Sequence, residues 1–507
     1  MGRVKSAERN ILFGYVGQIA TALMAFILRT VFIRYLSREL LGVNSLYTDI
    51  LTVLSMAELG IGTALNFSLY GPVARGEQEL IKSYMKMYRR VYTSVAMVIA
   101  AAGLLLVPFL PVLVRDPGPV TVDELRIYYL IFLFNTVTSY FVTYKYSLVN
   151  AEQKNYIQTN ILTITKIVSS TLQILVVVLT KNFLLFLLTD SAVQLIQKFL
   201  ANRYLNRLYP YLTEKDVRPL TKEESGEVWK KARALMLHRI GDIARLQTDS
   251  MIISSFINVS LAGIVNTNVL VVTTASNFVN IIFNNIVSGF GNLIATESRE
   301  RQYEMFGVYR FLASWLYGYS ACGFFVLLTP LVTLLWGPEL TLPAAALWLY
   351  LTDYYFKGER IVLTNFKTAA GIFEQDRYLA LFQGIVNLVL SIVLVQKIGL
   401  AGIYVGTVVS GLIANITKPF IIYHVCFDRK AWGYFADSAK YLAVTAIVTA
   451  VSFGAGTILR PEESLIRLLL MAVLITVLFF SAFFLLFGKT KECRYLLQLV
   501  RSKLHRE

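Results

Sequence analysis

Long apolar runs alternate with short polar segments along almost the whole chain. Most runs hold the roughly 20 residues that an α-helix needs to cross a lipid bilayer. The pattern predicts an all-α polytopic membrane protein of about 14 transmembrane helices, in which the runs at 42–70 and 232–257 are the least apolar. The fourteen runs lie at about 11–34, 42–70, 91–114, 125–149, 157–180, 182–206, 232–257, 261–294, 309–335, 342–366, 379–396, 400–423, 439–459 and 464–487.

The composition agrees with a lipid environment. Of the 507 residues, 56% are hydrophobic and only 16% are charged, whereas about 25% of the residues in a soluble domain are charged. This difference excludes an ordinary soluble enzyme, a disordered chain and a coiled coil. A net charge of +16 would suggest nucleic acid as the partner of a soluble protein. Basic loops beside anionic lipid explain the charge here, so we expect membrane lipids and no nucleic acid as partners.

Lysine and arginine are distributed unequally between alternate loops. The loops that include both termini and the polar stretch at 208–228 hold 32 of these residues, and the other loops hold 7. Because cytoplasmic loops carry the excess of lysine and arginine, we expect both termini and the 208–228 loop to lie in the cytoplasm. The opposite loops are short, which leaves no room for a catalytic domain outside the membrane.

Two short patterns recur at nearly the same offset. Residues 144–156 and 366–378 share an aromatic-Lys pair, then Glu-Gln, then Tyr, at an offset of 222. Residues 41–43 and 262–264 share an apolar-Gly-apolar pattern at an offset of 221. Chance is the alternative for motifs this short. A duplication would make two parallel six-helix halves that form a V-shaped bundle with a central cavity.

The repeat predicts four parts in the chain. Residues 1–207 would form the N-terminal six-helix half, and 208–228 a cytoplasmic linker. Residues 229–426 would form the C-terminal half, and 427–507 two additional helices with a basic cytoplasmic tail.

Ionisable residues inside a span are costly and usually face a cavity or a partner. The run at 232–257 carries Arg239, Asp242, Arg245 and Asp249, whose spacings of 3, 3 and 4 place them on one helix face. We expect this stripe to line a cavity and its arginines to bind a phosphate group through their planar, always charged forks. The alternative is a self-neutralising stripe that packs against another polar helix.

A second charged cluster occupies the run at 342–366. Asp353 and Lys357 lie one helical turn apart and could pair, and Lys357 and Arg360 share a face. All three are candidates for substrate binding, with a structural ion pair as the alternative. Arg29 in the first run is a further candidate, although its side chain could instead extend to lipid headgroups.

Glu58 lies in the middle of the second run, beside glycines that allow close helix approach or a local bend. We expect it to be a proton or cation site, a counter-charge for a cavity arginine, or a protonated structural residue. Lys145 lies near a predicted cytoplasmic helix end, which favours an interfacial anchor. Asp190 and Lys166 receive no role at this stage.

Several kinds of chemistry lack their sequence signatures. There is no GxxxxGK[ST], HExxH, GxSxG or CxxC motif. The three cysteines and three histidines are too scattered to suggest a disulfide framework or a metal cluster. We therefore expect no metal, no cofactor and no enzymatic activity.

Five segments resemble the polysaccharide-type exporters, the Wzx-like flippases of the multidrug/oligosaccharidyl-lipid/polysaccharide exporter superfamily. These segments are 370–378, 387–394 and 399–407 in the second half, Glu58 to Ala64, and the stretch from Thr248 to Gly263. The likeness extends over most of residues 10–425 and depends on the order of motifs that are individually weak. The charged stripe at 239–249 lies where the family's cavity residues are expected, at the start of the second half. The match is one of position, because the stripe follows no strict sequence motif.

The resemblance implies a flippase that moves undecaprenyl-pyrophosphate-linked oligosaccharide repeat units by alternating access across the bacterial cytoplasmic membrane. Capsule, exopolysaccharide and teichoic-acid exporters have this role. Cavity arginines would meet the pyrophosphate, and an ion gradient would drive or reset the cycle. A polysaccharide polymerase and assembly proteins would be its partners.

Other functions remain open at this stage. A cation-coupled drug or metabolite antiporter of the same superfamily is the main alternative, although few carboxylates lie in the predicted N-terminal half. An enzyme that acts on lipid-linked sugar would need larger outer loops, and a scaffold without transport activity is the third possibility.

Overall fold

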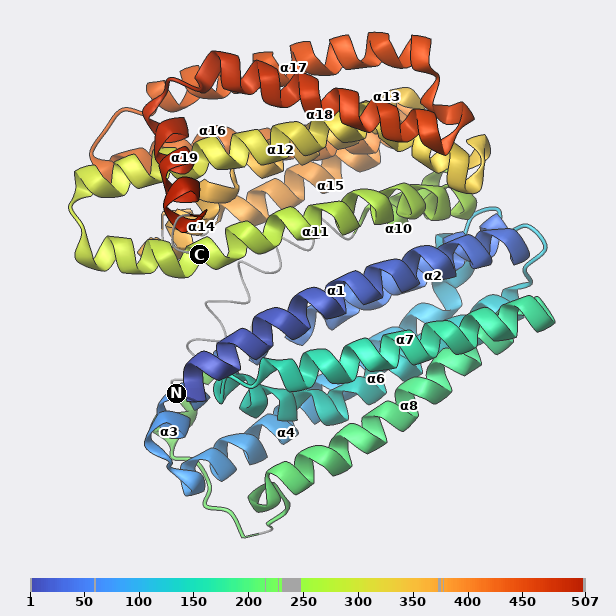
Figure 1. Ribbon diagram of the computed structural model, residues 1–507. Helices are drawn as coiled ribbons and strands as arrows, with labels where there is room; N and C mark the ends of the chain where they lie inside the picture. Colours follow the sequence, from blue (N-terminus) through green and yellow to red (C-terminus); the bar gives the residue numbers. More distant parts are fainter. Residues whose placement is uncertain are drawn as a thin grey trace. The chain divides into compact units, whose positions relative to one another are not determined.

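The computed structural model describes residues 2–504 apart from 59–60, 215, 227, 230–247, 373–374 and 377. Within these residues the regular structure is entirely helical (Figure 1). The chain forms two compact units, residues Met1–Gly263 (unit 1) and Ile264–Glu507 (unit 2). The helical prediction is confirmed, while the fourteen spans, the six-helix halves and the four predicted parts stay predictions.

Unit 1 consists of long helices joined by short turns. α1 packs along α7, α7 along α8, and α6 contacts both α4 and α8. The elements are α1 (Gly2–Tyr35), α2 (Arg38–Leu54), η1 (Ser55–Glu58), α3 (Ile61–Arg75), α4 (Gln78–Leu106), η2 (Val107–Phe109), α5 (Leu110–Leu113), α6 (Val122–Ala151), α7 (Asn155–Thr180), α8 (Phe183–Leu208), η3 (Pro210–Thr213) and α10 (Asp249–Phe256).

Local sequence signals set the helix ends in unit 1. The Thr121 hydroxyl accepts a hydrogen bond from the backbone N–H of Glu124, whose carboxylate accepts one from the Thr121 N–H at 2.8 Å, so α6 begins with a capping box. α7 ends at Lys181 in the left-handed conformation (φ 51°), and the Asn182 side chain then caps α8. Between α4 and α6, two prolines reduce the helix to the short pieces η2 and α5.

Helix α11 (Val259–Thr296) begins in unit 1 and crosses α2 there at two glycines. A Cβ atom on Gly42 would meet the carbonyl oxygen of Val259 and lie 2.5 Å from its carbonyl carbon. A Cβ atom on Gly263 would lie 2.7 Å from the backbone nitrogen of Gly42. The two glycine motifs that suggested a repeat are therefore in direct contact, and only a residue without a side chain fits at this crossing.

Unit 2 contains the rest of α11 and the remaining helices. Gly399, with φ 60°, ends α15 and lets α16 turn back along it. The elements are α12 (Arg299–Trp336), η4 (Pro338–Leu340), α13 (Ala344–Glu359), α14 (Ile361–Ala370), α15 (Leu379–Ile398), α16 (Leu400–Phe427), α17 (Trp432–Leu459), η5 (Pro461–Glu463), α18 (Leu465–Phe487) and α19 (Lys491–Leu504).

Helices α17 and α18 pack on α12 through an aromatic core and one buried cation. Phe311, Phe479 and Phe483 belong to this core. Arg310 lies 3.8 Å from the ring centroid of Tyr434 and donates hydrogen bonds to the Tyr434 carbonyl at 2.5 Å and to the Ser438 hydroxyl at 2.8 Å. The Arg310 side chain is buried, so the guanidinium joins α12 to α17 within the unit.

Eleven helices of the described part of the chain are long and apolar enough to cross a membrane. Of the other predicted runs, 42–70 is divided among α2, η1 and α3, and 342–366 between α13 and α14, so no piece reaches 18 residues. The run at 232–257 lies largely outside the described residues.

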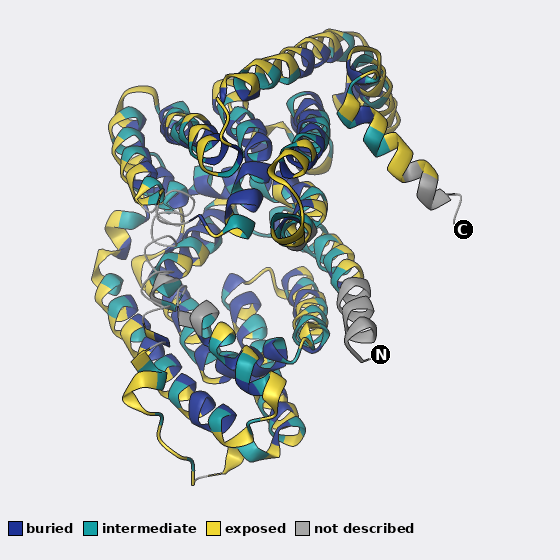
Figure 2. Cartoon of the chain, turned by 90° about the vertical axis from the view of Figure 1, so that its left-hand side faces the viewer, coloured by how far each residue is buried: buried dark blue, intermediate teal, exposed yellow. Residues whose placement is uncertain are grey.

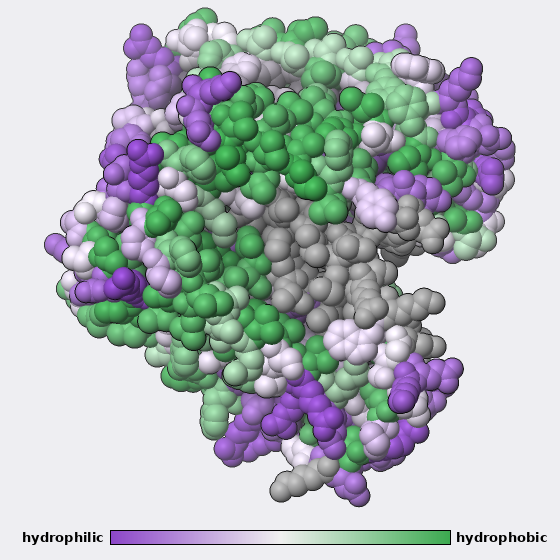
Figure 3. Space-filling view, turned by 180° about the vertical axis from the view of Figure 1, so that it is seen from behind, coloured by the Kyte–Doolittle hydropathy of each residue, from purple (hydrophilic) through white to green (hydrophobic). Residues whose placement is uncertain are grey.

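Apolar side chains occupy exposed positions as well as the core. Buried and exposed positions alternate around the individual helices (Figure 2). Ile458 on α17 is 84% exposed and Leu485 on α18 is 82% exposed. On the visible face of unit 2, hydrophobic groups cover the middle and hydrophilic groups gather at the two sides (Figure 3). This is the surface expected of helices whose outer faces contact lipid.

Candidate functional site

A polar cavity of about 550 Å³ lies inside unit 1. It is lined from α1, α2, η1, α6, α7 and α8, and three of its lining residues are ionisable. The polar side chains that the following argument uses are Glu58, Asn135, Tyr140, Lys166, Asp190 and Gln194. A cavity that combines charges with amides and hydroxyls inside an apolar bundle is a candidate functional site.

Glu58 reaches this cavity because the helix is interrupted beside it. It is the last residue of the 3₁₀ turn that follows α2, and α3 resumes at Ile61. The hydroxyl groups of Tyr92 on α4 and Tyr140 on α6 both hydrogen-bond to the Glu58 carboxyl group. Two hydroxyl donors hold this carboxylate in place and leave it able to accept a proton or a cation.

Asp190 on α8 is the second carboxylate of the cavity. Its two oxygens accept hydrogen bonds from the Ser169 hydroxyl at 2.5 Å and from the Gln194 amide at 2.6 Å. Among the described residues that line this cavity, Lys166 on α7 supplies the one positive charge. With two carboxylates and one ammonium, the cavity carries a formal charge of –1 when all three groups are ionised, which suits one monovalent cation or a proton.

The sequence predicted Glu58 as a site residue and assigned no role to Asp190 or Lys166. These two are separated from Glu58 by more than a hundred residues, and only the packing of α7 and α8 with α1 and α6 brings them to the same cavity. The available signal was a charge in the middle of an apolar run. Among the described residues, no group of three or more His, Cys, Asp or Glu is placed to hold a metal ion.

In unit 2, the ion pair that the spacing allowed is present. Lys357 Nζ lies 2.7 Å from the Asp353 carboxylate, which is almost fully buried, while the lysine side chain is 37% exposed. Arg360 is buried and donates to the Gly411 carbonyl at 2.9 Å and to the Asn415 side chain at 2.7 Å. These bonds hold the junction of α13 and α14 against α16, and substrate binding by the cluster stays a prediction.

Five further candidates receive less support from the described structure. Arg239, Asp242 and Arg245 lie outside the described residues, so their stripe stays a prediction. Asp249 is the first residue of α10 and is half-buried. Arg29 is half-buried on α1, where its neighbour Leu28 lines the polar cavity.

Lys145 is more deeply buried than its predicted place near a helix end suggests. Lys145 was expected to be an interfacial anchor, but its side chain is only 4% exposed. Its ammonium group hydrogen-bonds to the side-chain oxygens of Asn202 and Asn206 on α8. Position near a helix end does not reveal whether a neighbouring helix covers the side chain, and here α8 does so.

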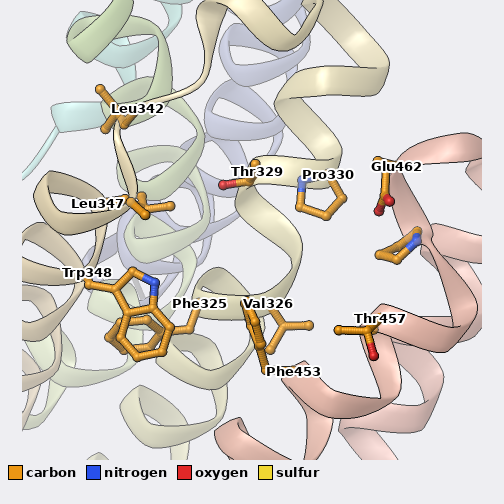
Figure 4. Close-up of a pocket in the computed structure, with 13 residues that line it drawn as sticks. Phe325, Val326, Thr329, Pro330, Leu342, Leu347, Trp348, Phe453, Thr457 and Glu462 are labelled. Atoms are coloured by element: carbon orange, nitrogen blue, oxygen red, sulfur yellow. The ribbon is translucent and has the colours of Figure 1, made fainter.

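An apolar pocket of about 340 Å³ in unit 2 has a different character. Phe325, Leu347, Trp348 and Phe453 face into it from α12, α13 and α17 (Figure 4). Glu462 is the only ionisable residue among those that line it. The pocket can hold an apolar chain, and it offers little that would orient a charged ligand.

No protein-family model matches the sequence, and no curated protein matches it. Similarity does appear among solved structures. The lipid II flippase MurJ in an inward closed conformation is 13% identical, with a TM-score of 0.65, and covers 94% of this chain and 99% of its own.

Two MATE transporters have the same architecture. An inward-facing MATE-family transporter of the MOP superfamily is 13% identical, with a TM-score of 0.62, and covers 84% of this chain and 98% of its own. A variant of the Vibrio cholerae MATE transporter VcmN is 15% identical, with a TM-score of 0.55, and covers 84% of this chain and 99% of its own. The chain thus has the fold of the MOP-superfamily transporters, a group that includes both a lipid flippase and multidrug exporters.

Proposed function

We propose that this protein is a membrane transporter that flips undecaprenyl-pyrophosphate-linked oligosaccharide repeat units for the synthesis of a cell-surface polysaccharide. It would act in the bacterial cytoplasmic membrane, with both termini in the cytoplasm. The transporter makes and breaks no bond in its substrate.

The observation that carries the proposal is the sequence resemblance to the polysaccharide-type exporters, which extends over most of residues 10–425. The structural likeness supports a transporter fold, because the flippase structure covers 94% of this chain and the two MATE transporters each cover 84%. The identities of 13–15% establish the shared fold and leave the substrate to experiment.

The proposed mechanism is alternating access. Arg239 and Arg245 would contact the pyrophosphate, because a guanidinium group donates paired hydrogen bonds to phosphate oxygens and stays charged. The polar cavity of unit 1 would couple the cycle to an ion gradient through Glu58 and Asp190. A proton or cation would bind this cavity more tightly in one conformation of the transporter than in the other. Its binding would therefore shift the equilibrium toward the conformation that binds it more tightly.

A cation-coupled drug or metabolite antiporter is the second candidate. The same cavity favours it, because Glu58 and Asp190 together provide a carboxylate pair in the N-terminal unit. The scarcity of carboxylates in the N-terminal half argues from the sequence against an antiporter, and the placement of Asp190 beside this cavity weakens that argument. Coupling through the cavity is compatible with both candidates, so substrate measurements must separate them.

The deciding experiment measures lipid-linked oligosaccharides on each face of the membrane in cells with and without the gene. Accumulation of undecaprenyl-linked repeat units on the cytoplasmic face after depletion supports the flippase. If the lipid-linked pools are unchanged and the sensitivity to cationic drugs is altered, the antiporter proposal replaces the flippase proposal.

Variants make the experiment specific to this chain. Arg245→Ala is expected to abolish export while the protein still inserts in the membrane, and normal export by a well-expressed Arg245→Ala protein would contradict the phosphate contact. Glu58→Gln tests ion coupling. Asp123→Asn is the matched control, because Asp123 is an exposed carboxylate at the start of α6 that does not line the cavity.

A further inference from the structure

A second pocket in unit 1 is strongly basic. It has a volume of about 970 Å³ and lies between α4, α6, α8 and the segment 211–217. Its lining includes five lysine or arginine residues and a single carboxylate, Glu214. The five cationic residues are Lys82, Lys86, Arg89, Lys145 and Lys198.

Lys145 has hydrogen-bond partners but no counter-charge. Its ammonium group has three donors, and two of them go to the side-chain oxygens of Asn202 and Asn206. Among the described residues it forms no ion pair, although its side chain is 4% exposed. An ammonium group withdrawn from water without an anion is costly, so the site favours the arrival of a negatively charged ligand that can accept the third hydrogen bond.

Lys198 repeats this arrangement one helical turn before Asn202 on α8. Its ammonium group donates to the Asn135 carbonyl and to the Thr138 hydroxyl, both at 2.8 Å. The side chain is 8% exposed and forms no ion pair within the described part of the chain. Two buried lysines on facing helices therefore each keep one donor for a ligand.

In unit 2, a buried lysine forms an ion pair with a carboxylate. At the offset of 222 residues the counterpart of Lys145 is Lys367, which is also buried. Lys367 is paired with the Asp376 carboxylate at 2.5 Å. The residue that corresponds to Asp376 at the same offset in unit 1 is Lys154. The buried lysine is neutralised inside the protein in unit 2, whereas unit 1 has a further cation at the position of the acid.

Helix α4 adds positive charge from the opposite wall. Lys82, Lys86 and Arg89 are spaced by four and three residues, so they share one helix face. Glu79 and Glu214 neutralise Lys82, at 2.8 and 2.5 Å from its Nζ. Lys86 and Arg89 are exposed and form no ion pair with any described residue. Because Lys82 already uses Glu214, the pocket's one carboxylate compensates none of the other four cations.

The rim of the pocket is apolar. Phe141 on α6 is 48% exposed, and Leu195 and Phe199 on α8 are 39% and 65% exposed. In a membrane, exposed apolar side chains of this kind contact lipid tails. The pocket therefore places four cations that form no ion pair with a described residue next to a surface that accepts hydrocarbon, and Asp190 attracts one of them, Lys198, from a distance.

We propose that this basic pocket binds the phosphate group of an anionic membrane lipid, with the lipid's acyl chains along Phe141, Leu195 and Phe199. Phosphate oxygens are strong acceptors for the remaining donors of the lysines that line this pocket. Basic pockets between transmembrane helices are the usual sites for anionic headgroups. The inference concerns a binding site within unit 1 and does not depend on the proposed transport function.

The test counts bound lipids on the purified full-length protein by native mass spectrometry. The probes are dioleoyl-phosphatidylglycerol, zwitterionic dioleoyl-phosphatidylcholine and inorganic pyrophosphate. Arg89→Gln is compared with Arg90→Gln, because both arginines are exposed neighbours on α4 and only Arg89 lines the pocket. Lys145→Met is compared with Lys166→Met, because Lys166 lines the polar cavity and does not line the basic pocket; Tyr140 is the described residue that the two linings share.

We expect phosphatidylglycerol to bind in preference to phosphatidylcholine, and Arg89→Gln to weaken its binding about fivefold while Arg90→Gln leaves it unchanged. Lys145→Met should weaken phosphatidylglycerol binding further. If this substitution of a buried residue prevents folding, the comparison of Arg89→Gln with Arg90→Gln still tests the proposal, because Arg89 is exposed. In a second supporting outcome, pyrophosphate displaces the bound lipid in the wild-type protein and does so less effectively in Arg89→Gln. That result would support recognition of a phosphate group by the pocket, with a soluble phosphate as the ligand. Equal binding of the two lipids, or equal effects of Arg89→Gln and Arg90→Gln, would overturn the proposal.

Discussion

Replacing Gly42 by alanine should loosen the crossing of α2 and α11 in unit 1. The added methyl group would meet the Val259 carbonyl group, with its carbon atom only 2.5 Å away. This distance is far below ordinary van der Waals contact, and the obstructing atoms are backbone, which cannot move aside by changing a rotamer. The helices must therefore separate at the point where Gly263 also lies against the Gly42 backbone.

Two opposing effects set the magnitude. Alanine gains about 0.5–1 kcal/mol over glycine in a helix interior, and overpacking a tight contact costs about 1–3 kcal/mol. We expect a net loss of about 1–2 kcal/mol. Because 1 kcal/mol shifts the midpoint by about 2–4 °C for a unit of this size, the apparent melting temperature should fall by roughly 2–8 °C.

The assay is thermal unfolding of the purified protein, followed by size-exclusion chromatography of heated samples. Gly14→Ala on α1 is the matched control, because a Cβ atom at Gly14 meets nothing within 4 Å. The control should keep or raise the midpoint. Adding Val259→Ala to Gly42→Ala should give no recovery, since the clash involves the carbonyl group. A Gly42→Ala midpoint equal to that of Gly14→Ala would refute the reasoning.

Three other predictions concern ionisable groups. Glu58→Gln and Asp190→Asn should each lower the transport rate in proteoliposomes at least tenfold at equal protein levels. Full transport activity of both variants would exclude ion coupling through the polar cavity. Arg310→Met should destabilise unit 2 by about 3 kcal/mol, because it removes the charged hydrogen bonds to α17, and an unchanged midpoint would contradict this. Burial raises the pKa of the Cys493 thiol. Maleimide at pH 7.5 should therefore label Cys493 more slowly than a cysteine introduced by Arg494→Cys at the neighbouring exposed position. Equal labelling rates would contradict the burial of Cys493.

The sequence alone determined the helical class and most helix positions. Apolar runs of membrane length predict helices because a backbone in lipid must satisfy its hydrogen bonds internally. Gly399 lies between two predicted runs and ends α15, because its backbone conformation differs from that of a helix interior. The predicted run at 91–114 passes through the two prolines at which the structure divides the helix into α4, η2 and α5. Glu58 could also be selected as a candidate from its place in an apolar run.

Only the tertiary structure decided which of these residues meet. Asp190 and Lys166 join Glu58 at one cavity through the packing of three helices, and Lys145 is buried because α8 covers it. The glycines at 42 and 263 are in contact, a relation that a repeated pattern could not indicate. The physical reason is that hydropathy records the solvent each residue prefers. Which helix faces pack together depends on shape complementarity among residues far apart in the chain.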